Sequence, residues 1–106
     1  MPKYLLQASY TAEGTKGLAK DGGSKRRAHI EEVVKKLGGR LEAFYYAFGE
    51  HDVYVIADVP DAETAAAISL AVNGSGAVRA KTTVLLSPED MDRASQKSVG
   101  YRPPGA

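Results

Sequence analysis

Two neighbouring segments that are apolar or aromatic at nearly every position most constrain the fold of this chain. They span residues 41–47 and Val53–Val59, and a turn at residues 49–52 joins them. β-Branched and aromatic residues on both sides of a short loop with glycine predict a β-hairpin. A strand with one face in water alternates polar and apolar residues, so both faces of this hairpin need cover. A chain of 106 residues has little material for the second face, which predicts self-association and a lined space between subunits.

The rest of the chain alternates between helix and strand signals. An apolar stripe at helical spacing from Ile30 to Leu37 predicts a helix that Ser24 caps and Gly38-Gly39 ends. The other predicted elements are a strand over 3–11, a loop with a helical turn over 11–20, a helix capped by Asp61 and ended by Asn73-Gly74, a strand over 78–86, and a short helix from Ser87 to about Ala94.

The resulting order, β-α-β-β-α-β, is that of a ferredoxin-like α+β fold. Right-handed crossovers place both helices on one face of a four-stranded antiparallel sheet, which leaves the other face bare. We therefore expect one ferredoxin-like domain over 1–94 and a mobile C-terminal tail over 95–106. Two such sheets packed face to face would form a dimeric α+β barrel.

Strict alternation of side chains along each strand predicts the residues of the bare face. It selects Phe44, Tyr46 and Phe48 on the second strand, and Tyr54 and Ile56 on the third. An exposed apolar patch of that size is unusual on a monomer, and its burial at about 25 cal/mol per Å2 favours association. We therefore expect a homodimer or a multiple of dimers. The predicted polar neighbours of this patch are Gln7, Arg79, Lys81 and Thr83.

Composition narrows the function classes. The formal net charge of +1 gives no basis for nucleic-acid binding. The absence of cysteine removes disulfides, thiolate nucleophiles and cysteine-type zinc sites. The N-terminus lacks the apolar core of a signal peptide, and no apolar run approaches the length of a membrane span. We expect a cytoplasmic protein with neither nucleic-acid nor membrane partners.

The segments 36–39, 49–53 and 76–82 are similar to those of the GYD domain family, a group of small bacterial proteins. The resemblance extends over residues 4–86 and thus covers most of the chain. It implies a ferredoxin-like fold that forms a dimeric α+β barrel. It implies no activity, because the family as a whole has none assigned.

The hairpin turn contains the first candidate site. The family name refers to a Gly, a Tyr and an Asp here; Gly49 and Asp52 match, and His51 stands in the position of the Tyr. A histidine beside a carboxylate can act as a general base near neutral pH. Alternatively, His51 is an ordinary turn residue and Asp52 hydrogen-bonds the turn backbone. Gly49 is expected to take a positive φ.

The second candidate site is a ligand pocket between paired sheets. Tyr46 and Tyr54 can stack on a flat ligand or simply fill an interface. Arg79 and Lys81, two residues apart on one strand, can hold a carboxylate or phosphate, or pair with an interface acid such as Glu42 or Asp58. The predicted lining is His51, Tyr46, Tyr54, Arg79, Lys81 and Gln7.

Other polar residues give weaker signals. The run Lys25-Arg26-Arg27 predicts a solvated helix face, with phosphate binding at the helix N-terminus as the alternative. His29 is predicted to be a solvated helix residue. The two histidines are far apart and lack ligand spacing, so no metal site is expected. No cofactor is expected either, although haem stays an alternative because one axial histidine can suffice.

Two functions remain open at this point. One is a small-molecule-binding dimer that acts on an aromatic or anionic ligand held between the two sheets. The other is a non-catalytic assembly or regulatory protein whose aromatic face is only an oligomer interface. A cavity lined by polar groups supports the first, and a dry, filled interface supports the second.

Overall fold

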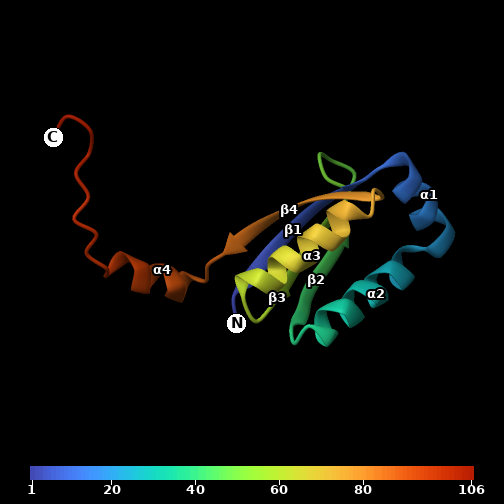
Figure 1. The fold of residues 1–106 in the computed structure, drawn as a ribbon, viewed down its shortest axis with the longest axis horizontal. Helices are drawn as coiled ribbons and strands as arrows, with labels where there is room; N and C mark the ends of the chain where they lie inside the picture. Colours follow the sequence, from blue (N-terminus) through green and yellow to red (C-terminus); the bar gives the residue numbers. More distant parts are fainter.

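The computed structural model describes residues 1–106 as one four-stranded antiparallel sheet with four helices (Figure 1). The strand order β2-β3-β1-β4 is the ferredoxin-like order, so the predicted fold class is confirmed. The elements are β1 (Lys3–Tyr10), α1 (Ala12–Asp21), α2 (Gly23–Lys36), β2 (Arg40–Tyr46), β3 (Val53–Asp58), α3 (Ala62–Gly74), β4 (Val78–Leu85) and α4 (Pro88–Ser95).

The first crossover contains two helices where the sequence predicted one. The Thr11 hydroxyl accepts a hydrogen bond from the Gly14 N–H and caps α1, so the segment predicted as a loop is helical. Gly22, with φ 87°, separates α1 from α2, and glycine adopts this conformation without steric cost. Because α2 already begins at Gly23, Ser24 lies inside the helix and the prediction that it caps α2 is wrong.

The later helices begin where the sequence predicted. The Asp61 carboxylate accepts a hydrogen bond from the Thr64 N–H at 2.8 Å and caps α3. Ser87 and Asp90 form a reciprocal capping box at the start of α4. No helix in the chain has the length and apolar character required to cross a membrane.

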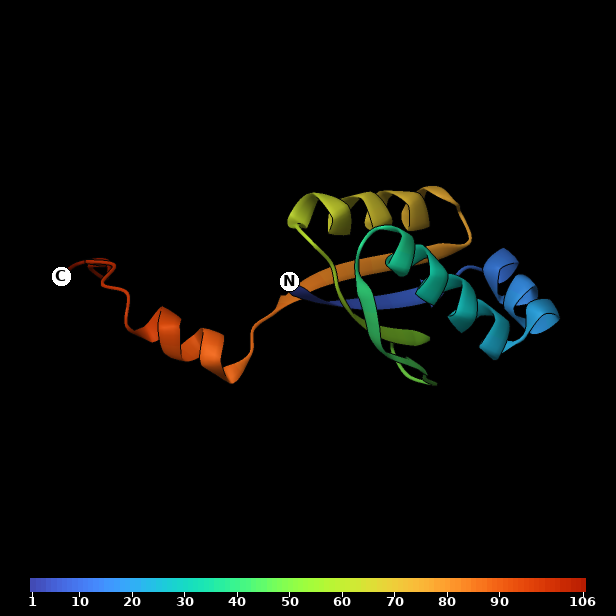
Figure 2. The same ribbon diagram turned by 90° about the horizontal axis from the view of Figure 1, so that it is seen from below.

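α2 and α3 lie on the same side of the sheet, and the opposite side is open (Figure 1, Figure 2). α2 packs chiefly against β2 and α3 against β4, which are the two outer strands. The central strands β1 and β3 therefore form the floor of a space between the helices. Only nine of the 106 residues are buried, and no large side chain is fully buried. Much of the apolar surface of the single chain is thus exposed.

A β-bulge interrupts β2 near its start. Leu41 pairs with Ala57, whereas Ala43 pairs with Ile56, so the register shifts at Glu42. One extra residue in a strand moves every later side chain to the opposite face of the sheet. The prediction of which side chains lie on each face assumed strict alternation, and this alternation does not hold across Glu42.

The bulge overturns the predicted placement of the aromatic residues of β2. Phe44 and Tyr46 pair with the β3 valines that face the helices, so the prediction that they lie on the bare face is wrong. Tyr45 lies on the open face instead, opposite Tyr54. Phe48 lies beyond the end of β2 and is fully exposed. The open face is therefore less aromatic than the sequence indicated.

Gly49 does not have the backbone conformation that the sequence predicted. Its φ is not positive, and a Cβ at this position would meet no atom within 4 Å. β2 ends at Tyr46 and β3 begins at Val53, so residues 47–52 connect the strands. A connection of this length reverses the chain direction without a left-handed residue, unlike a two-residue hairpin turn.

α4 and the residues after it extend away from the sheet (Figure 1, Figure 2). The radius of gyration is 16.8 Å, compared with about 13 Å for a compact chain of this length. Met91, Val99 and Tyr101 present exposed apolar side chains along this segment, and Leu86 does so just before it. The compact part of the molecule is the sheet with α1, α2 and α3.

Two glycines of α1 provide a matched test of its packing. A Cβ at Gly14 would lie 1.9 Å from the Ala77 carbonyl oxygen, whereas a Cβ at Gly17 would meet nothing within 4 Å. We expect Gly17→Ala to raise the free energy of unfolding by about 0.5–1 kcal/mol, because alanine loses less entropy in a helix. Gly14→Ala should lower it by about 1–3 kcal/mol through overpacking. Urea denaturation measures both values, and equal effects of the two substitutions would contradict the packing of α1.

Candidate functional site

The open face brings together four of the predicted ligand-binding residues. Gln7 pairs with Tyr54 on β3 and with Lys81 on β4, and Arg79 pairs with Ser9. Directly opposed residues of an antiparallel pair share a face, so these side chains are neighbours. Arg79 and Lys81 form no ion pair within the chain. This end of the open face therefore presents two uncompensated positive charges.

The other end of the open face is charge-compensated. Lys3 contacts Glu42 and lies 3.0 Å from Asp58, and Arg40 lies 3.4 Å from Asp58. Burial by itself would raise the pKa of the Asp58 carboxyl, but Lys3 and Arg40 outweigh it and hold that pKa below its usual value. Glu42 and then Asp58 raise the pKa of Lys3. The acids expected to partner Arg79 and Lys81 are thus engaged by other cations of the same chain.

His51 and Asp52 contact different parts of the molecule. The His51 ring packs edge-on against Tyr54, with ring centroids 5.8 Å apart. The Asp52 carboxylate accepts a hydrogen bond from the Tyr10 N–H at 2.8 Å, and the Asp52 N–H donates to the Ala8 carbonyl at 2.8 Å. Asp52 therefore ties the hairpin loop to β1 rather than orienting the imidazole of His51.

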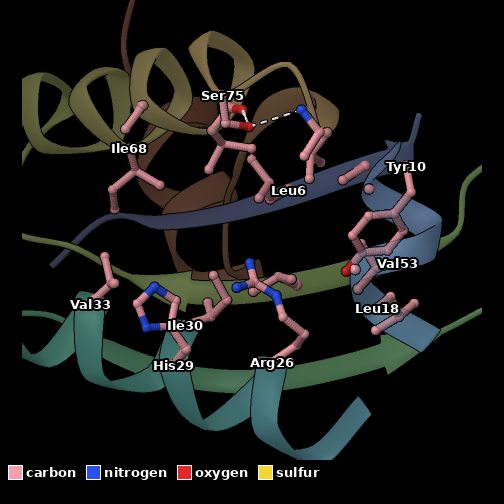
Figure 3. Close-up of a pocket in the computed structure, with 18 of the residues that line it drawn as sticks. Leu6, Tyr10, Leu18, Arg26, His29, Ile30, Val33, Val53, Ile68 and Ser75 are labelled. Atoms are coloured by element: carbon pink, nitrogen blue, oxygen red, sulfur yellow. Dashed lines mark hydrogen bonds between the residues drawn. The ribbon is translucent and has the colours of Figure 1, made fainter. Parts of the chain in front are cut away.

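The helix-covered side of the sheet contains a cavity between α2 and α3 (Figure 3). Its volume is about 450 Å3, and 15 of its 22 lining residues are hydrophobic. The floor comes from Leu6, Ala8, Val53 and Val55 on the two central strands. Ligand pockets are typically about 300–1,000 Å3 in volume and mostly apolar. The size and the lining of this cavity therefore suit a small organic molecule.

Arg26 is the one arginine or lysine among the lining residues. Its guanidinium points from α2 into the cavity, and the Tyr10 hydroxyl points toward the same space (Figure 3). Glu13 and Asp21 of α1 also line this cavity, but neither forms an ion pair with Arg26. Arg26 is half-buried, so its charge faces apolar walls without a matching anion from the chain.

Tyr46 holds the start of α2 against β2. Its hydroxyl donates a hydrogen bond to the Gly23 carbonyl at 3.1 Å. Burial, followed by the neighbouring Tyr10, raises the pKa of the Tyr46 phenol, and the charge of Arg26 offsets this in part. The phenol stays neutral near physiological pH, so it keeps its proton for Gly23. Tyr46 thus positions the helical turn that carries Arg26. It lies on the opposite face of the sheet from Tyr54.

The sequence predicted that Arg26 and His29 lie on a solvated helix face. His29 is exposed as predicted, whereas Arg26 is half-buried, so the structure corrects the prediction for Arg26. Both side chains line the cavity (Figure 3). They precede Ile30 and Val33 of the apolar stripe by four residues each, and residues four apart lie on the same side of a helix. Extending the stripe by one turn toward the N-terminus would have placed them on the sheet-facing side.

The topology and the cavity define a ferredoxin-like α+β domain with an apolar space between its two layers. The model of the GYD domain family matches residues 4–95, so the chain belongs to this family. The resemblance inferred from the sequence is therefore confirmed. No curated protein and no solved structure matches the chain.

The Asp52–Tyr10 hydrogen bond can be tested by substitution. We expect Asp52→Ala to lower the free energy of unfolding by about 1–3 kcal/mol, because the Tyr10 N–H loses its acceptor. Asp52→Asn retains an acceptor oxygen and should cost clearly less. Urea denaturation measures both variants. An asparagine variant as unstable as the alanine variant would show that the carboxylate has another role.

Proposed function

We propose that this GYD domain protein binds a small, largely apolar molecule in the cavity between α2, α3 and the sheet. The supporting observation is the 450 Å3 cavity over the central strands, with 15 hydrophobic residues among the 22 that line it. The apolar walls of an empty cavity lack dispersion contacts with partner atoms. A ligand of complementary shape would recover them and remove its own apolar surface from water.

The cavity is a better ligand site than the open sheet face. Its floor and walls belong to one subunit, whereas a pocket on the open face requires a second one. Phe44 lines the cavity, and Tyr46 supports the helix above it. The aromatic residues of β2 that were expected between two sheets thus contribute to this side. The ligand would therefore bind on the helix-covered face and not between two sheets.

A cavity-filling substitution tests this proposal. Ala71 and Ala66 on α3 are both exposed, but only Ala71 lines the cavity. We expect Ala71→Phe to weaken binding of the neutral apolar dye 1-N-phenylnaphthylamine by about tenfold or more, because the new ring occupies the ligand space. Ala66→Phe should leave binding unchanged. Dye fluorescence titration measures both, and equal binding by the two variants would refute the cavity as the ligand site.

We further propose that the open face forms the interface of a homodimer, which would be a dimeric α+β barrel. The side chain of Tyr45 is 69% exposed on this face, beside Tyr54. Leu5 and Ile56, which pair with each other, add aliphatic surface to the same face. A two-fold axis would bring this patch against its own copy. Burial of its apolar area supports association.

Charge substitution tests the interface. Tyr45→Lys should weaken dimerisation by about a hundredfold, because an unpaired ammonium would be buried at the contact. Phe48→Lys is the matched control, since Phe48 is fully exposed beyond the end of β2 and should leave the dimer intact. Sedimentation equilibrium at micromolar concentration measures both. A monomeric wild-type protein would exclude this interface.

A further inference from the structure

We infer that the cavity ligand is an aliphatic carboxylate whose head group pairs with Arg26 and whose chain lies over β1 and β3. This inference rests on the proposed function, that the cavity binds a small molecule. It adds the chemical class of the ligand and the residue that selects it. Two features support it, the unmatched charge of Arg26 and the aliphatic character of the walls. The nearby acids oppose a bound anion and so favour a head group of low charge.

Arg26 supplies the anion-binding end of the cavity. Its guanidinium points into the space and forms no ion pair within the chain (Figure 3). A half-buried charge without a partner is unfavourable, and the planar guanidinium matches a carboxylate with two parallel hydrogen bonds. Tyr10 and His29 face the same space (Figure 3), and each side chain can donate a hydrogen bond to a carboxylate oxygen.

The acids near this end favour a carboxylate over a phosphate. Glu13 and Asp21 of α1 line the cavity and are both exposed to water. They contribute a negative potential that opposes a bound anion. A phosphate monoester carries about −1.5 to −2 charges at neutral pH, whereas a carboxylate carries one. The repulsion is therefore smaller for the carboxylate, whose single charge is matched by that of the Arg26 guanidinium.

The walls favour an aliphatic chain over a flat ring. Phe44 and Tyr10 are the only residues of the lining with a benzene ring, besides the imidazole of His29, and stacking on a flat ligand depends on aromatic faces. The floor follows β1 from Tyr10 to Leu6, a distance of about 13 Å at the rise of an extended strand. Branched aliphatic side chains dominate the rest of the lining: Leu6, Leu18, Ile30, Val33, Val34, Val53, Val55, Ile68, Val72 and Val78.

Displacement of the bound neutral dye from the full-length protein tests the inference. We expect decanoate to displace it at concentrations about tenfold lower than decan-1-ol, because only decanoate pairs with Arg26. From octanoate to decanoate, each methylene should strengthen binding about fourfold. Arg26→Met should remove the preference for decanoate and leave the affinity for decan-1-ol within about twofold. Arg26→Lys, which keeps the positive charge, should retain part of the preference.

Arg27→Met is the matched control. Arg27 is the next residue of α2, is exposed and does not line the cavity, but its loss changes the net charge equally. It should keep the full preference for decanoate. If Arg27→Met lost the preference as Arg26→Met does, the head group would lie outside the cavity and the inference would be overturned.

The remaining outcomes separate the inference from the proposed function. Equal displacement by decanoate and decan-1-ol in the wild-type protein would overturn the carboxylate assignment and leave small-molecule binding standing. Tighter binding of decyl phosphate would overturn the choice of head group, and tighter binding of naphthoate would overturn the aliphatic chain. Failure of both the dye and the decyl compounds to bind would refute the proposed function together with the inference.

Discussion

The register shift at Glu42 decides what each face of the sheet presents. One extra residue in β2 turns Phe44 and Tyr46 toward the helices and Tyr45 toward the open side. From its new position, the Tyr46 hydroxyl reaches the Gly23 carbonyl and holds the start of α2 on the outer strand. The placement of α2, and with it the direction of Arg26, follows from a bulge of a single residue.

The cavity results from the positions of α2 and α3 on the sheet. α2 packs on β2 and α3 on β4, so the central strands lie uncovered between them. Small valine and alanine side chains on this floor leave room that larger residues would fill. The one cation that enters the space lacks an acid partner in the chain. A concave apolar surface and a charge that lacks an ion-pair partner are together features of a ligand site.

Local signals in the sequence determined much of the secondary structure. Asp61 caps the helix that it was predicted to cap, and the last helix starts at Ser87 as predicted, because the hydrogen bonds involved span only three residues. Three residues of the predicted stripe, Ile30, Val33 and Val34, face inward, since helical spacing sets their direction. Leu37, the last residue of the predicted stripe, is 41% exposed just past the end of α2. The family and the order of the elements along the chain were predictable too, because runs of β-branched and aromatic residues mark the strands.

Only the tertiary structure decided the facing of the aromatic residues and the position of the site. The Asp52–Tyr10 and Tyr46–Gly23 hydrogen bonds join residues 42 and 23 positions apart, which no local pattern encodes. Alternation along β2 could not show the bulge, because the cross-strand register depends on pairing with β3. The sequence by itself determined the elements and their order. Which side chains contact one another depends on the pairing of distant strands and on the strands against which the helices pack.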